Sequence, residues 1–364
     1  MMKIAIAAGG TGGHLFPAYG FYETLMRTGC APDSFFFVSQ KDEPFTAHWK
    51  VRKVRLKIIG LPRKISFSIV LFLIYLTGSF FKSLKVILKE KPCLIIGFGG
   101  YVSVAPLLAG VLLRVPVVIH EQNVVPGKVN RLLSFFALRV MTGLDTTAKN
   151  WPKQVRHKIM FTGIPVRGTV NKTTTKPLFE KNDCFTVLII GGSQGALVFN
   201  EWVPQLLECL KDKTDSIRFI HLAGRTDVSQ IESVYDEYGF INRCFGFCHN
   251  MADVYAVTDF ALCRAGAGTL TELALAAIPA VVIPYPYAAD AHQLCNARLF
   301  MDAQAVELIE EKNATPEIVA QRIKYYLGDK AELKRMRTAM RKMAVPDAGK
   351  KITEIVKKII DETR

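Results

Sequence analysis

The sequence predicts an α/β protein of two doubly wound, Rossmann-like domains, and three observations support this prediction. Apolar segments of strand length alternate with longer segments of helical periodicity along nearly all of the 364 residues. A strand-like segment that runs into a glycine-rich loop and a helix occurs twice, with GGTGGH at 9–14 and GGSQGA at 191–196. Between them, residues 163–183 are rich in Gly, Pro, Thr and Lys, which is typical of a linker and a surface loop.

The first half of the chain is expected to form one parallel sheet covered by helices. The strands are expected at Lys3–Ala8, Ser34–Ser39, Leu94–Gly97, Val117–His120 and Arg139–Thr142. The helices are expected at Leu15–Arg27, Ser66–Lys89, Ser103–Leu113 and Gly127–Phe136. Strands that alternate with helices indicate βαβ units, whose strands run parallel.

The same rhythm restarts after the linker. Strands are expected at Phe185–Ile190, Ile217–His221, Phe260–Cys263 and Ala280–Ile283, and helices at about 196–211, 229–238, 268–277, 291–302 and 315–327. We place the domains at 1–165 and 166–344, and expect a last helix within 345–364 to pack back on the first domain. Ligands of such sheets bind beyond the carboxyl ends of the strands.

The charge of the chain is strongly one-sided. Its formal net charge is +15, yet residues 1–170 hold 23 Lys and Arg against 7 Asp and Glu, whereas the remainder holds 24 against 25. A basic half of this kind favours a polyanionic partner. No nucleic-acid-binding motif accompanies it, so we expect no nucleic acid and favour an anionic membrane surface.

The uncharged segment 65–81 lies in this basic half, with Arg63 and Lys64 before it and Lys82 and Lys85 after it. Three interpretations are open: a membrane-spanning helix, a buried crossover helix, or a helix partly exposed as an apolar patch ringed by cations. A spanning helix would interrupt the strand–helix alternation on both sides. The one-sided charge favours the exposed patch, docked on a membrane surface.

Several chemistries find little support in the sequence. The eight cysteines are scattered in apolar surroundings, and Cys244 and Cys248 with His249 lack further ligands at motif spacing, so we expect reduced thiols and no metal. The N-terminus lacks the features of a signal peptide. GGTGGH departs from G-x-G-x-x-G, and neither glycine loop is followed by the acid that grips a ribose, which disfavours NAD or FAD. No Gly-Lys-Ser/Thr follows either loop, so a P-loop is absent.

Seven segments, taken in order, resemble one enzyme family. They are GGTGGHLFP at 9–17, GFGGYVS at 97–103, HEQN at 120–123, GIPVR at 163–167, GGSQGA at 191–196, CRAGAGTLTE at 263–272 and DAHQLCNA at 290–297. The chain closely resembles the MurG family of bacterial transferases, within glycosyltransferase family 28, and the resemblance runs through nearly all of it. It implies a GT-B fold, in which the two doubly wound domains face each other across a cleft.

The resemblance implies an inverting N-acetylglucosaminyltransferase of peptidoglycan synthesis, and hence of cell-wall biogenesis, cell shape and division. Its members transfer GlcNAc from UDP-GlcNAc to the C4 hydroxyl of lipid I, the undecaprenyl-diphosphate-linked MurNAc-pentapeptide, and form lipid II. The expected location is peripheral, at the cytoplasmic face of the cell membrane, with other cell-wall synthesis proteins as further partners. No cofactor is expected.

Donor-binding residues follow from the resemblance, and they lie mostly on the second domain. Glu272 would accept hydrogen bonds from the ribose hydroxyls, Gln293 would hold the GlcNAc hydroxyls, and backbone near Cys248 would recognise uracil. The start of the helix after CRAGAG would receive the diphosphate at backbone N–H groups. Further donor contacts are expected from Ser193, Arg167, Ala267, Gly268, Thr269, Leu270 and Thr271.

The first domain is expected to take the acceptor, whose diphosphate suits GGTGGH and the basic surface. The resemblance also brings Thr11, Gly12, Gly13 and Asn123 toward the donor. Inversion requires a base for the acceptor hydroxyl, and His14 occupies the expected place at the end of a strand. His120 and Glu121 are the competing candidates. Adjacent residues of a strand point oppositely, so these two are not expected to act as a pair, and each would reach the site alone or support its geometry.

Two alternatives and one departure remain. Another GT-B enzyme of UDP-GlcNAc, such as a non-hydrolysing 2-epimerase, would explain the donor residues but not the basic half. A membrane-bound protein that binds UDP-sugar without catalysis would be favoured if His14, Glu272 or Gln293 were missing, and all three are present. Where the family usually has Gly-Asn-Pro-Val-Arg this chain has Ile164, which weakens the transfer of roles around Arg167.

Overall fold

The computed structural model describes residues 2–40, 46, 49–61, 67–145, 148–168, 178–179, 183–192 and 195–363. The chain forms two compact units, one made of Met1–Arg167 with Asp347–Arg364 and the other of Gly168–Pro346. The boundary follows Arg167, slightly later than the sequence suggested, and the last helix belongs to the first unit. Ser193 and the cations Arg63 and Lys64 lie outside the described residues.

The first unit is built on a seven-stranded sheet of order β3-β2-β1-β4-β5-β6-β7, in which every neighbouring pair is parallel. The strands are β1 (Ile4–Ala7), β2 (Phe35–Ser39), β3 (Lys53–Leu56), β4 (Leu94–Gly97), β5 (Val117–Glu121), β6 (Arg139–Thr142) and β7 (Ile159–Phe161). Ala7 pairs with both Phe37 and Gly97, so the loops after β1 and β4 leave the sheet side by side.

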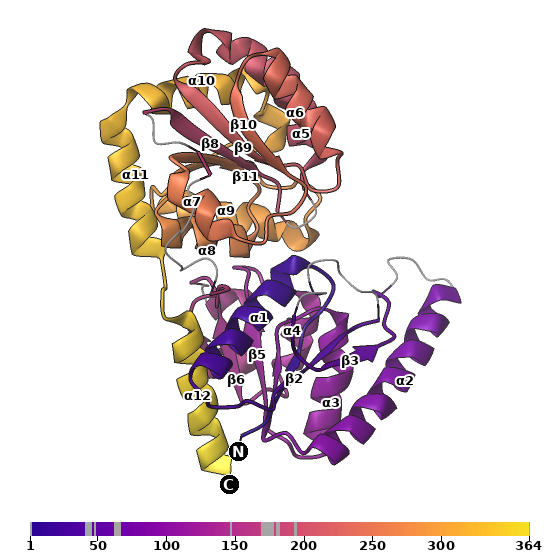
Figure 1. The fold of residues 1–364 in the computed structure, drawn as a ribbon. Helices are drawn as coiled ribbons and strands as arrows, with labels where there is room; N and C mark the ends of the chain where they lie inside the picture. Colours follow the sequence, from indigo (N-terminus) through magenta and orange to yellow (C-terminus); the bar gives the residue numbers. More distant parts are fainter. Residues whose placement is uncertain are drawn as a thin grey trace. The chain divides into compact units, whose positions relative to one another are not determined.

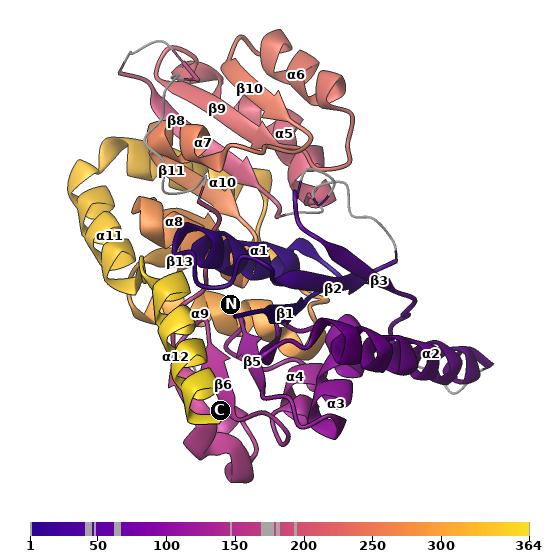
Figure 2. The same ribbon diagram turned by 60° about the horizontal axis from the view of Figure 1, so that its bottom comes forward.

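Helices cover both faces of this sheet (Figures 1 and 2). α1 (Gly12–Arg27) and α12 (Ala348–Thr363) lie on one face, and α2 (Phe67–Glu90), α3 (Val104–Leu112) and α4 (Lys128–Leu133) on the other. Gly349 lets α12 approach α1 closely, because a Cβ there would stand within 2.4 Å of the Thr24 hydroxyl. The chain therefore ends packed against its own beginning.

The second unit repeats the arrangement with a six-stranded parallel sheet of order β10-β9-β8-β11-β12-β13. Its strands are β8 (Phe185–Ile190), β9 (Ile217–Leu222), β10 (Ile241–Phe245), β11 (Phe260–Cys263), β12 (Ala280–Val282) and β13 (Val306–Leu308). Its helices are α5 (Leu197–Leu210), α6 (Val228–Glu237), α7 (Met251–Val257), α8 (Ala267–Ala276), α9 (His292–Asp302), α10 (Pro316–Gly328) and α11 (Lys330–Met343). Two Rossmann-like units with parallel sheets confirm the predicted fold class.

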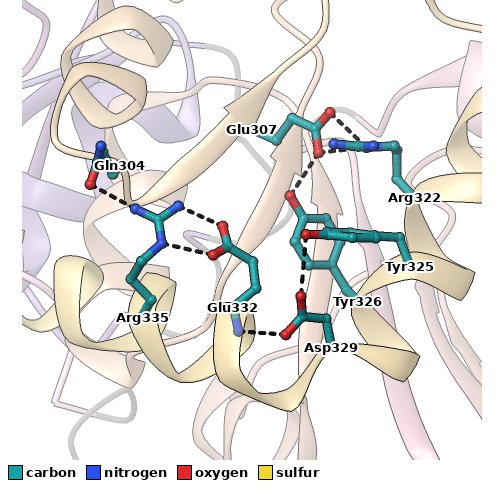
Figure 3. Close-up of polar contacts among 8 residues, drawn as sticks. All are labelled: Gln304, Glu307, Arg322, Tyr325, Tyr326, Asp329, Glu332 and Arg335. Atoms are coloured by element: carbon teal, nitrogen blue, oxygen red, sulfur yellow. Dashed lines mark hydrogen bonds and ion pairs between the residues drawn. The ribbon is translucent and has the colours of Figure 1, made fainter.

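A polar network fixes the end of the second unit before the chain returns to the first (Figure 3). Glu307 of β13 accepts hydrogen bonds from Arg322 and Tyr326 of α10, both at 2.7 Å. Arg335 of α11 binds Glu332 through two nitrogens and also donates to the amide oxygen of Gln304. β13 is a short edge strand, and these bonds tie it to α10, while α11 is bonded to Gln304 just before the strand.

Helix α2 is long, apolar and only partly covered. It is the one helix among the described residues that is long and apolar enough to cross a membrane by length and composition, and 17% of its apolar window is buried within the structure. A single stripe that includes Phe72, Ser79, Ser83 and Ile87 faces the unit. The opposite face exposes large apolar side chains: Phe67, Val70, Leu73, Ile74, Phe81 and Leu88. The interpretation of this segment as a buried crossover helix is therefore wrong.

The candidate active site

Two glycine-rich loops of the first unit meet at the carboxyl ends of β1 and β4. Gly100, at φ +75°, lies so close to Gly9 that a Cβ would stand 2.2 Å from the Gly9 carbonyl oxygen. Gly9 in turn has no room for a Cβ beside Val102. GGTGGH and GFGGY therefore form one surface in which backbone packs on backbone, and only glycine fits at these contacts.

This surface ends at the start of α1, where backbone N–H groups are open. The Thr11 carbonyl already accepts bonds from the N–H groups of His14 and Leu15. The N–H groups of Gly12 and Gly13 precede the first intrahelical bonds, and Thr11 and Gly13 are exposed. Thr11 and Gly13 are thus exposed at the positive end of a 16-residue helix, which suits an anionic group, whereas Gly12 between them is buried.

His14 lies beside these glycines, and its ring is held from one side. Its Nδ1 is 2.9 Å from Oε1 of Gln122, which follows β5. Gly99, at φ +100°, makes room for the ring, because a Cβ there would stand 3.0 Å from Cε1 and Nδ1 of His14. Half-buried and bonded through Nδ1, the imidazole keeps Nε2 as its second functional atom.

His120, at the end of β5, lies inside the first unit. Its side chain is fully buried, its Nε2 lies 2.9 Å from the Gly163 carbonyl oxygen, and its ring packs on Phe98. Burial lowers the pKa of His120 to about 4, because desolvation penalises the imidazolium. A neutral, buried ring of this kind supports the geometry of its neighbours and has no access to a substrate hydroxyl.

The Glu121 side chain is also buried. Its Oε1 accepts hydrogen bonds from the backbone N–H and the side-chain amide of Asn123, at 3.0 and 3.1 Å. Its Oε2 accepts from the backbone N–H of Gly127 and from the Asn130 amide, at 3.0 and 2.9 Å. With all four partners donating, the carboxylate shapes the loop after β5 and orients Asn123, and direct access to the acceptor does not fit this geometry.

The GIPVR segment at 163–167 packs within the first unit next to these residues. Gly163 accepts the His120 bond, and Ile164 is buried against Gly143, where a Cβ would stand 2.3 Å from its Cγ1. The Arg167 guanidinium lies 4.3 Å from the centre of the Phe16 ring, and its Nε has no hydrogen-bond partner although it is buried. Ile164 thus takes an apolar packing role, and Arg167 stays next to the helix that carries His14.

In the second unit, the two motifs expected to bind the donor are joined by hydrogen bonds. Asn296 of α9 is buried and donates to the Ala265 carbonyl oxygen in the loop before α8. Arg264 donates to the carbonyl oxygens of Ile283 and Pro284, and it forms an ion pair with Glu311 at 2.5 Å. The sequence reasoning did not single out Arg264 or Asn296, whose role is to hold neighbouring loops rather than to present a reactive group.

Helix α8 supplies both a helix N-terminus and a carboxylate. Its cap Gly266 is extended, and Ala267, Gly268 and Thr269 form the first turn. The N–H of Leu270 is already bonded to the Gly266 carbonyl, and its side chain is fully buried, as is most of Thr271. The N–H groups without an intrahelical partner are thus those of residues 267–269, and Leu270 and Thr271 contribute packing.

The same helix carries Glu272, which is half-buried and accepts a hydrogen bond of 2.7 Å from the Tyr255 hydroxyl.

Gln293 and Cys248 lie on neighbouring loops of the same unit. The Oε1 of Gln293 accepts a hydrogen bond from the Tyr285 N–H at 2.9 Å, which fixes the oxygen end of the amide. The loop before it holds Asp290 and Ala291 at φ of +51° and +50°, a left-handed backbone that is strained for residues other than glycine. Cys248 follows β10 and is half-buried. All cysteines are free, and the described residues contain no group of three or more metal-ligating side chains.

The comparisons with known proteins agree over the whole chain. The glycosyltransferase family 28 N-terminal domain matches residues 4–142, and the family 28 C-terminal domain matches residues 186–352. A protein of Rickettsia prowazekii (strain Madrid E) is 35% identical, with 89% of this chain and 90% of the relative covered. A protein of Myxococcus xanthus is 30% identical, with 100% and 94% covered. Both relatives are named UDP-N-acetylglucosamine–N-acetylmuramyl-(pentapeptide) pyrophosphoryl-undecaprenol N-acetylglucosamine transferase.

A solved structure shows the same architecture. The crystal structure of MurG from Acinetobacter baumannii superposes with a TM-score of 0.75 at 28% identity, and the match covers 98% of this chain and 100% of that one. The fold and the two family domains thus agree.

Proposed function

This chain belongs to glycosyltransferase family 28, and we propose that it transfers N-acetylglucosamine from UDP-GlcNAc to undecaprenyl-diphosphate-linked MurNAc-pentapeptide, which forms lipid II for peptidoglycan synthesis. The observation that carries the proposal is the 35% identity, over nine tenths of both chains, to a relative named for this reaction. The positions of His14 and Gln293 in the first turns of α1 and α9, and of Glu272 within α8, support it.

The second unit is assigned the donor. The three open N–H groups at the start of α8 meet the diphosphate, and Glu272, steadied by Tyr255, accepts from the ribose hydroxyls. Gln293, with its oxygen fixed by the Tyr285 N–H, directs its amide nitrogen to the sugar. Charge that develops on the leaving UDP is met by the same N–H groups, so we expect transfer to continue in the presence of a chelator.

The first unit is assigned the acceptor. The exposed N–H group of Gly13 and the excess of Lys and Arg in residues 1–170 suit the lipid-linked diphosphate. Inversion needs a single displacement, in which the acceptor C4 hydroxyl attacks the anomeric carbon while the bond to UDP breaks. Nε2 of neutral His14 takes the hydroxyl proton, because Nδ1 is already engaged with Gln122.

We also propose that the exposed face of α2 docks on the anionic surface of the cytoplasmic membrane, as a peripheral contact. Phe67, Ile74 and Phe81 are between 57% and 74% exposed on this face. Tyr101 of the GFGGY loop packs edge-on against Phe72 of the same helix, 5.8 Å between ring centres. The inner side of α2 therefore contacts the loop that is assigned to the acceptor, while its outer side stays exposed for the membrane that holds the acceptor lipid.

The proposal is tested by incubating the protein with UDP-GlcNAc labelled in the sugar and a short-chain lipid I analogue. Transfer predicts label in the lipid product and release of UDP that depends on the acceptor. Labelled UDP-ManNAc formed without acceptor would instead indicate a 2-epimerase, and tight binding of UDP-GlcNAc without turnover on the acceptor would indicate a binding protein.

A further inference from the structure

A chain of hydrogen bonds with a single direction runs from the Gly163 carbonyl oxygen through His120 and Gln122 to His14. The four groups come from the GIPVR segment, the end of β5 and the start of α1, so this hydrogen-bond chain joins three segments that are far apart in sequence. Gln122 and His120 are both buried to 1% exposure or less. We propose that Gln122, set by His120, is a positioning residue that holds His14 in the tautomer with its proton on Nδ1.

The donor and acceptor roles along these hydrogen bonds are set by the first of them, between His120 and Gly163. A backbone carbonyl oxygen can only accept, so the Nε2 of His120 that lies 2.9 Å from it must carry the proton. Burial keeps this imidazole neutral, as the low pKa of about 4 reflects. Its Nδ1 is then a lone-pair acceptor, and the amide nitrogen of Gln122 lies 3.1 Å away from it.

The orientation of the Gln122 amide is fixed a second time by its other neighbours. The same nitrogen lies 3.1 Å from the Phe98 carbonyl oxygen and 3.2 Å from the His120 carbonyl oxygen, so its two hydrogens are shared among three acceptors, two of which belong to His120. A flipped amide would set its oxygen against these two acceptors and leave a buried nitrogen facing His14. The amide oxygen therefore points at His14, and Nδ1 of His14 must donate to it at 2.9 Å.

The consequence for His14 is an unprotonated Nε2, ready to accept. The amide oxygen accepts from Nδ1 equally in neutral imidazole and in imidazolium, so His14 can gain a proton on Nε2 without any change in its partner. Gln122 is also uncharged, so it holds the ring through a hydrogen bond without adding an ionic interaction. The inference rests on the proposed role of His14, but the tautomer is measurable without any substrate.

The titratable groups around this chain of bonds are few. His120 is a member of it, and Glu121 is bonded to Asn123, Gly127 and Asn130. The Asn130 amide touches both Glu121 and the His120 carbonyl oxygen, at 2.9 and 3.2 Å. Glu121 therefore braces the backbone that carries His120 and Gln122, while Gln122 alone contacts the His14 ring through a hydrogen bond among the described residues.

The test is nitrogen NMR of the full chain labelled with ¹⁵N-histidine, without substrate and at about pH 8, above the ordinary histidine range. The His14 signals are identified by their loss in His14→Ala. The inference predicts a protonated Nδ1 and an unprotonated Nε2, which is the form that free histidine disfavours. A wild-type spectrum with the proton on Nε2 would overturn it, whatever the behaviour of any variant.

Gln122→Met removes the acceptor while keeping the length of the side chain, and Gln230→Met, at an exposed position of the second unit, is the matched control. We expect His14 to revert to the Nε2-protonated form in Gln122→Met alone, and kcat to fall roughly tenfold without a change in the Kd of UDP-GlcNAc. An unchanged tautomer in folded Gln122→Met would refute the positioning role. Loss of transfer in every variant and in the wild type would instead refute the proposed function and leave the tautomer result standing.

Discussion

The Tyr255 hydroxyl donates a hydrogen bond of 2.7 Å to Oε2 of Glu272, across the packed helices α7 and α8. Tyr255 is 5% exposed, whereas Glu272 is half-buried. The tyrosine therefore holds one carboxylate oxygen of Glu272 from inside the unit. A ribose that offers two hydroxyls would meet a carboxylate whose rotamer is already set.

Tyr255→Phe should weaken the binding of UDP-GlcNAc by about two- to tenfold, because one hydrogen bond of about 0.5–1.5 kcal/mol no longer orders Glu272. Isothermal titration calorimetry gives the Kd. Tyr325→Phe, at an exposed tyrosine of α10, is the control and should bind normally. In Glu272→Ala the Tyr255 substitution should add nothing further, and additive effects of the two changes would show that Tyr255 acts elsewhere.

Replacing two exposed anchors of α2, in the variant Ile74→Asp/Phe81→Asp, should reduce binding to vesicles that contain anionic lipid by about tenfold or more. Each anchor contributes about 1.5–3 kcal/mol when it leaves water, and the added charges oppose the anionic surface. Vesicle co-sedimentation at two salt concentrations measures the effect.

The control for this pair is Leu197→Asp, since Leu197 is 65% exposed at the start of α5 in the second unit. It should bind vesicles as the wild type does. Equal losses in the control and in the α2 variant would assign the membrane contact to general hydrophobicity and not to α2.

Gly100→Ala should destabilise the first unit and lower kcat, whereas Gly10→Ala should have a smaller effect on both. Both glycines have positive φ, +75° and +101°, so alanine costs conformational energy of about 1–3 kcal/mol at either position. Only at Gly100 would the Cβ also strike a backbone oxygen, at 2.2 Å, which forces GFGGY away from GGTGGH. Thermal unfolding and the transfer rate measure the two effects, and equal losses would contradict the contact.

The free energy of unfolding should fall between about pH 6.5 and pH 4 through two buried histidines. Burial lowers the pKa values of His120 and His221 to about 4, so the unfolded chain binds protons in this range that the folded chain does not. The stabilisation is complete above the unfolded pKa of about 6.5 and is lost as the pH falls toward 4. Each histidine contributes about 3 kcal/mol at most, at 1.36 kcal/mol per pKa unit.

His221→Gln isolates one of these contributions. His221 bonds Asn200 and Tyr235 at 2.9 and 3.1 Å, and an amide can replace part of this bonding without titrating. Unfolding midpoints measured from pH 7.5 to pH 4.5 should depend less on pH in the variant. An unchanged slope would show that His221 does not contribute to the acid sensitivity.

The central strands and their helices could be predicted because burial on both faces makes their sequences continuously apolar, as in Phe185–Ile190 and Leu94–Gly97. The edge strands β3, β7, β10 and β13 escaped prediction. Segments such as Lys53–Leu56 and Ile241–Phe245 carry charged or polar residues on an open edge and are short, so their pattern resembles a loop.

The residues of the candidate site also fall into two groups, those that could be predicted from the sequence and those that could not. Residues within glycine-rich motifs, such as His14 and Gly13, stand out in the sequence because loops that approach ligands need those residue types. Gln122, Tyr255 and Asn296 act through a partner that is distant along the chain, at 108, 17 and 31 residues respectively. Only folding brings such pairs together, so no local spacing reveals them.

The measurement that tests the account most directly is the transfer of labelled GlcNAc by His14→Ala, together with the Kd of UDP-GlcNAc for the same variant. Loss of a general base predicts that kcat falls by about 10²–10⁴ while the Kd of the donor stays within about twofold of wild type. A variant that transfers GlcNAc at nearly the wild-type rate would contradict the assignment of His14 as the base that activates the acceptor.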